Sequence, residues 1–105
     1  MMRQWLVLLV VVLLLAPPSV FAVEAPSVEL GKRLFESIQL GSKGRSCESC
    51  HRQGEGLDKI GDFNDMELRD IINACIRDAL GGELLGVESQ EMDSLHSYVK
   101  TFQKN

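Results

Sequence analysis

The chain has 105 residues, with 15 acidic and 11 basic side chains and a formal net charge of −4. This acidity argues against a nucleic-acid partner, which would favour a basic surface. The length allows a single domain, and a domain this small often needs a cofactor, a metal or disulfides to supplement its hydrophobic core.

The first 22 residues differ chemically from the rest. Arg3 gives the start one positive charge, the twelve residues 5–16 are all apolar, and Pro17 and Pro18 end this run shortly before Ala22. A basic start, a short apolar middle and a small residue at a cleavage point are typical of a secretory signal peptide. A retained membrane anchor is the weaker alternative, because a spanning helix needs roughly 20 apolar residues.

We therefore predict a signal peptide over residues 1–22 and an exported, periplasmic domain over residues 23–105. Loss of Arg3 leaves 10 basic against 15 acidic residues, a net charge of −5 on 83 residues. For this domain we expect no nucleic-acid partner and no stable membrane span.

The first helix of the domain is expected over residues 28–39. Ser27 can cap its start, and Gly41 is expected to stop it. Its apolar residues lie near one helical face: Val28, Leu30, Leu34, Phe35 and Ile38. A polar loop over residues 41–45 then leads to a cluster of cysteines.

Residues 47–51 read Cys-Glu-Ser-Cys-His, a C-x-x-C-H motif in a chain with three cysteines. Two thiols at this spacing can add across the two vinyl groups of a haem, and the following histidine can bind the iron. We therefore predict one covalent haem c attached through Cys47 and Cys50, with His51 as the proximal ligand. The alternatives are a thioredoxin-like redox pair, a zinc site that also uses Cys75 and a histidine, and a Cys47–Cys50 disulfide.

Residues 52–64 are rich in glycine and charge, show no clear period, and are predicted to be loop. Asn64 and Glu67 form a capping-box signature for a middle helix, which Gly81 and Gly82 are expected to end. The apolar residues of this helix recur at steps of three and four along one face: Leu68, Ile71, Ile72, Cys75, Ile76, Ala79 and Leu80.

A second loop follows over residues 81–88, and Ser89 is expected to cap a last helix. The apolar residues of that helix again share a face: Met92, Leu95, Tyr98, Val99 and Phe102. Residues 23–105 show no alternating strand pattern and no repeat. The sequence therefore predicts an all-α fold.

The segments around Gly31–Phe35 and Leu95–Val99, together with the C-x-x-C-H motif, resemble the class I cytochrome c family. The resemblance extends over nearly all of residues 23–105. It implies a small fold whose helices wrap around one covalently bound haem. It also implies that the first and last helices cross, with Gly31 allowing the close approach and Tyr98 in the aromatic position.

The sequence departs from that family at the sixth iron ligand. Most members place a methionine in the loop before the last helix, but here that loop, residues 81–88, contains none. The other candidates are Cys75, Met66, Met92 and His96, or an open position. Methionines fill cores far more often than they bind iron, and we expect His96 to be partly exposed.

Cys75 lies at the centre of the apolar face of the middle helix. Its simplest interpretation is a buried free thiol that packs as a small apolar group. However, residues 72–76 and 89–92, followed by Tyr98-Val99, resemble the haem domains of the sulfur-oxidising complex's cytochrome subunit and of thiosulfate dehydrogenase. That resemblance implies that Cys75 is the distal iron ligand and the site where sulfur substrates react.

These observations favour an electron-transfer protein linked to sulfur-compound oxidation. Its partners would be redox proteins, including other cytochromes or sulfur-oxidising subunits. The alternative is a haem-containing subunit or enzyme that oxidises thiosulfate or a related compound through Cys75. A weaker third option is a haem-based sensor, which requires an open sixth position. The sequence leaves open whether the protein is an enzyme.

Overall fold

The computed structural model describes residues 25–104, so the expected signal peptide lies outside the described residues. Within this range the chain is helical and contains no strand, which confirms the all-α prediction. None of the helices described is long and apolar enough to cross a membrane.

The helix α2 (Val28–Glu36) starts as predicted but ends three residues before the expected end at residue 39. The Ser27 hydroxyl caps it by accepting the Leu30 N–H at 2.9 Å. Ser37 then leaves the helical conformation, and its hydroxyl accepts the Gln39 N–H at 3.0 Å to begin the short turn η1 (Ile38–Leu40). The helix ends early because the Ser37 side chain bonds to a nearby backbone donor in a non-helical conformation.

The first and last helices cross closely. The contact of α2 with α5 (Gln90–Lys100) is the most extensive between any two described helices. A Cβ atom at Gly31 would lie 2.0 Å from the Ser94 carbonyl oxygen, so only glycine fits here. The Phe35 ring packs edge-on against Tyr98 with centroids 5.2 Å apart, and Phe102 lies 5.7 Å from Phe35. The expected roles of Gly31 and Tyr98 in this crossing are confirmed.

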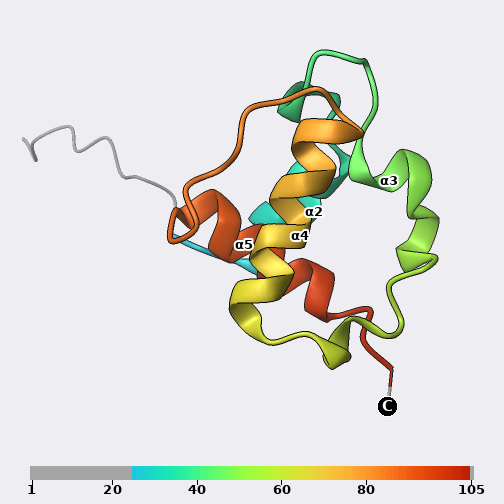
Figure 1. Cartoon of the computed structure of the whole chain (residues 1–105), viewed down its shortest axis with the longest axis vertical. Coiled ribbons are helices and arrows are strands. Elements are labelled where there is room, and N and C mark those ends of the chain that lie inside the picture. The colour runs from blue at the N-terminus through green and yellow to red at the C-terminus, as the bar shows by residue number, and fades with distance from the viewer. Residues whose placement is uncertain (1–24, 105) are drawn as a thin grey trace, which may run out of the picture.

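The middle helix, α4 (Asp65–Asp78), crosses in front of α2 and α5 in Figure 1. Its predicted cap is present, because Asn64 accepts the Glu67 N–H at 2.9 Å through its side-chain oxygen. Gly81 has a φ of +68°, and the Gly82 N–H bonds to the Ile76 carbonyl at 2.9 Å. This is the glycine-dependent helix end that the sequence predicts.

The loop over residues 81–88 is tied to α4 by two side chains of that helix. The Asn73 amide donates to the Leu85 carbonyl at 2.9 Å and accepts the Leu85 N–H at 2.8 Å. Arg69 donates to the Val87 carbonyl at 2.6 Å. The buried Asn73 therefore fixes the path of the chain between α4 and α5.

The last helix, α5, starts as predicted, with the Ser89 hydroxyl accepting the Met92 N–H at 3.1 Å. The hydrophobic core draws on α2, α4, α5 and the segment between α3 (Cys47–Cys50) and α4. Its buried members are Phe35, Ile60, Leu68, Ile72, Ile76, Leu80, Met92, Leu95 and Val99.

Candidate functional site

The C-x-x-C-H motif forms its own short helix, α3, with His51 at its C-terminal cap. Ser46 precedes it and is buried. Its hydroxyl accepts the Ser49 N–H at 3.2 Å, while the Ser49 hydroxyl accepts the Ser46 N–H at 2.9 Å. This reciprocal cap holds Cys47 and Cys50 on a single helical turn.

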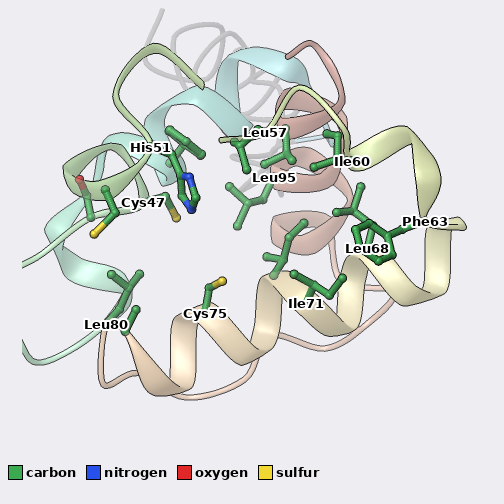
Figure 2. A pocket seen from close by; sticks show the side chains of 16 residues that line it. Cys47, His51, Leu57, Ile60, Phe63, Leu68, Ile71, Cys75, Leu80 and Leu95 are labelled. Atoms are coloured by element: carbon green, nitrogen blue, oxygen red, sulfur yellow. The ribbon is translucent and has the colours of Figure 1, made fainter. Parts of the chain in front are cut away.

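The imidazole of His51 is oriented by a backbone hydrogen bond. Its Nδ1 lies 2.8 Å from the Glu55 carbonyl oxygen. Because a carbonyl can only accept, Nδ1 carries the proton and Nε2 keeps its lone pair. Nε2 makes no hydrogen bond among the described residues, and Figure 2 shows the ring extending into an open space.

That space is an apolar cleft of about 700 Å³, counting its open mouth. One wall is the motif itself, with Cys47, Cys50 and His51. A second wall comes from the segment between α3 and α4 and consists of Leu57, Ile60 and Phe63. The third wall is α4 and the residues after it, and the floor is part of the core. The cleft therefore presents thiols and an imidazole to an otherwise hydrophobic volume.

Cys75 lies on the α4 wall, on the far side of the cleft from the motif. Figure 2 shows its sulfur directed into the same space as the His51 ring. Its side chain is exposed on the cleft and does not pack in the core, which contradicts the interpretation of Cys75 as a buried packing thiol. The apolar face of α4 is thus divided: Ile76 lies in the core, Cys75 and Ile71 are open to the cleft, and Ile72 is buried but also lines the cleft.

The electrostatics of the thiols follow from this setting. Burial raises the pKa of Cys47 to about 11, with a smaller contribution from Cys75. The pKa of Cys75 is also raised, first by partial desolvation of its sulfur against the apolar lining and then by the nearby carboxylate of Asp78. Both thiols therefore hold their protons more tightly than an exposed cysteine does.

The remaining candidates for an iron ligand lie elsewhere. Met66 is 53% exposed and Met92 is fully buried in the core, and neither lines the cleft. The loop over residues 81–88 does not line it either. Among these candidates only Cys75 shares the cleft with His51.

The expectation that His96 is partly exposed is wrong. Its side chain is buried, and Nε2 lies 3.4 Å from the Asp65 carboxylate in the first turn of α4. Burial lowers the pKa of His96, Arg69 lowers it further, and Asp65 opposes the shift. The pattern of apolar residues in α5 places His96 only beside the apolar face of that helix. His96 is nevertheless buried, because α4 packs against α5 and covers it.

Sequence reasoning missed the wall formed by Leu57, Ile60 and Phe63. The segment between α3 and α4 was expected to be loop, but it contains the 3-10 turns η2 (Arg52–Gly54) and η3 (Ile60–Asp62). The available signal was the spacing of the three apolar residues at steps of three, the period of a 3-10 helix.

Of the alternative uses of the motif, the zinc site finds no support. No cluster of three or more histidine, cysteine or acidic side chains suited to a metal occurs within residues 25–104. His96 lies outside the cleft that the three cysteines line. Cys47 and Cys50 form no disulfide in the structure, which goes against the disulfide alternative. The strand-to-helix junction of a thioredoxin-like pair is likewise absent from the part of the chain that the structure describes.

Comparisons with family models, with known proteins and with solved structures found no match. The geometry of the cleft therefore carries the functional argument.

Proposed function

We propose that this chain is an exported class I-type cytochrome c that carries one haem c and transfers single electrons between redox proteins. In this proposal Cys47 and Cys50 hold the haem through thioethers and His51 is the proximal iron ligand. The protein acts in the periplasm after removal of residues 1–22. The sequence resemblance links it to sulfur-compound oxidation.

The observation that carries the proposal is the shared cleft. Two thiols on one helical turn, an imidazole with a free Nε2 lone pair and an otherwise apolar lining meet in one volume. A covalently attached haem needs this combination, because it is a flat apolar ring with two vinyl groups that react with thiols and a central iron that binds an imidazole. The residues present therefore fit a covalently attached haem.

The chain's own groups have defined tasks in this scheme. Bound in the cleft, the haem supplies a reversible one-electron couple. The Glu55 carbonyl holds the proton of His51 on Nδ1, which keeps Nε2 available as a ligand. Leu57, Ile60 and Phe63 would limit the access of water to one side of the haem. The low polarity that they create around the haem is one of the factors that set its reduction potential.

We further propose Cys75 as the distal ligand, because it is the one sixth-ligand candidate that lines the cleft together with His51. Bound to the iron, the Cys75 sulfur would be a thiolate, and its negative charge would stabilise the ferric state and so lower the reduction potential. An electron paramagnetic resonance spectrum of the oxidised protein reports the axial ligands. We expect a histidine–thiolate signature that disappears in Cys75→Ala, whereas the far-red absorption band of histidine–methionine ligation would contradict the assignment.

An enzyme that oxidises sulfur anions would use a cation beside Cys75 to hold its anionic substrate, and the two cations that contact Asp78 already have partners. Asp78 lies close enough to Cys75 to raise the pKa of this thiol. Arg77 forms two hydrogen bonds with the Asp78 carboxylate, at 2.8 and 2.9 Å. Lys43 donates to the Asp78 backbone carbonyl at 3.0 Å. The cations nearest this carboxylate are therefore already engaged.

Turnover assays separate the two functions. The purified haem protein is mixed with thiosulfate and an artificial electron acceptor, and separately with a reduced and an oxidised redox protein. A carrier exchanges electrons with both proteins and leaves thiosulfate unchanged. If the protein oxidises thiosulfate and Cys75→Ala abolishes this activity, the protein is an enzyme and the proposal of an electron carrier is wrong.

A further inference from the structure

A strained residue follows the haem-binding motif. Gln53 has φ 53° and ψ 31°, and it is the one non-glycine residue with a positive φ in the described range. A side chain in this left-handed conformation costs about 1–2 kcal/mol, so neighbouring contacts must hold it there.

The contact that holds it comes from inside the motif. Glu48, the second residue of α3, accepts the Gln53 N–H through a carboxylate oxygen at 3.1 Å. If the helix simply continued, this N–H would bond to the carbonyl of Ser49 instead. The Glu48 carboxylate is therefore the acceptor that allows the chain to leave the helix directly after His51.

The turn that results supplies the partner of the His51 ring. The Gly54 N–H bonds to the His51 carbonyl at 2.9 Å and the Glu55 N–H to the Arg52 carbonyl at 3.0 Å. Gly54 packs closely against the Phe102 ring: a Cβ atom on Gly54 would lie 2.1 Å from a carbon of that ring. The Glu55 carbonyl then lies 2.8 Å from Nδ1 of His51.

We propose that Glu48 is a positioning residue for the proximal ligand: through Gln53 it sets the turn that places the Glu55 carbonyl on His51 Nδ1. This inference rests on the proposed haem site. A firm hydrogen bond at Nδ1 makes the imidazole a stronger electron donor to iron, which stabilises the ferric state and lowers the reduction potential. Glu48 thereby acts on the iron without contacting it.

The test compares Glu48→Ala with Glu48→Gln in the haem-carrying protein. Both variants remove the negative charge, but the glutamine retains an acceptor oxygen for the Gln53 N–H. Two quantities are measured: the exchange rate of the His51 Nδ1 proton, by nuclear magnetic resonance of the ferrous form, and the midpoint potential. We expect Glu48→Ala to accelerate exchange by roughly tenfold or more, the equivalent of one charge-assisted hydrogen bond. We also expect its potential to rise above that of Glu48→Gln.

Glu55→Gln is the matched control, because it removes a charge from the same turn and leaves the accepting backbone carbonyl in place. It should shift the potential by no more than Glu48→Gln does and leave Nδ1 exchange unchanged. Gln53→Gly removes the strain, so Glu48→Ala should have a smaller effect in that background.

Equal Nδ1 exchange and equal potentials in Glu48→Ala and Glu48→Gln would overturn the inference. Failure of the haem proposal is visible separately, because the wild-type protein would then contain no covalent haem. The exchange rate of the Gln53 amide, compared between wild type and Glu48→Ala, would still test the Glu48 contact in that sample.

Discussion

Gly31 is the position at which the helix crossing is most sensitive to a single methyl group. In Gly31→Ala the new Cβ would lie 2.0 Å from the Ser94 carbonyl oxygen and 2.7 Å from the Tyr98 Cβ. Two of the atoms it meets are backbone atoms of Ser94. No side-chain rotation relieves that contact, so α2 and α5 must separate by about 1 Å or more in a close-packed core.

The expected cost follows from opposing terms. Inserting a methyl group where the backbone cannot yield typically costs about 1–3 kcal/mol, and separation of the helices loosens the Phe35–Tyr98 contact in addition. Alanine recovers up to about 1 kcal/mol through its higher helix propensity. We expect a net loss of about 2 kcal/mol in the free energy of unfolding.

Urea unfolding of the purified wild type and variant, followed by circular dichroism, measures this loss. Gly86→Ala is the matched control, because its new Cβ would lie 3.5 Å from the Ser89 Cβ, an ordinary contact distance, and the φ of Gly86 is not positive. This control should change stability by less than about 1 kcal/mol in either direction. If Gly31→Ala is as stable as Gly86→Ala, the close crossing of α2 and α5 is not as described.

Two further predictions concern buried polar groups. Asn73→Ala leaves both polar groups of the Leu85 backbone without their partner and should lower the free energy of unfolding by about 2 kcal/mol, with faster exchange of the Leu85 amide; an unchanged amide exchange rate would contradict it. For His96 the folded-state pKa is lowered, so the unfolded chain takes up the proton first as the pH falls below 6.5. Its contribution to stability is therefore present above pH 6.5 and is lost below it, and the urea midpoint of wild type should fall more steeply with acid than that of His96→Gln. Parallel pH profiles of the two proteins would count against this prediction.

Local chemistry made the helix starts predictable. Ser27, Asn64 and Ser89 each accept a backbone N–H three residues ahead, and such caps depend on a few adjacent residues only. That Cys47, Cys50 and His51 lie together was predictable for the same reason, because their spacing keeps them within about one helical turn.

Features that depend on tertiary packing were not predictable in this way. The burial of His96 arises from the first turn of α4, which is distant in sequence. The division of the α4 face, with Ile76 in the core and Cys75 on the cleft, depends on where α3 and the segment after it lie. Glu48 gave no sequence signal, because its contact with Gln53 depends on a non-glycine residue adopting a left-handed conformation.

The most direct test of the account is the intact mass of the protein after export from a host that matures c-type cytochromes. We expect the mass of residues 23–105 plus one haem that stays attached on denaturation, and loss of that covalent haem when Cys47 and Cys50 are both replaced by serine. A colourless protein with the mass of the bare processed chain would contradict it.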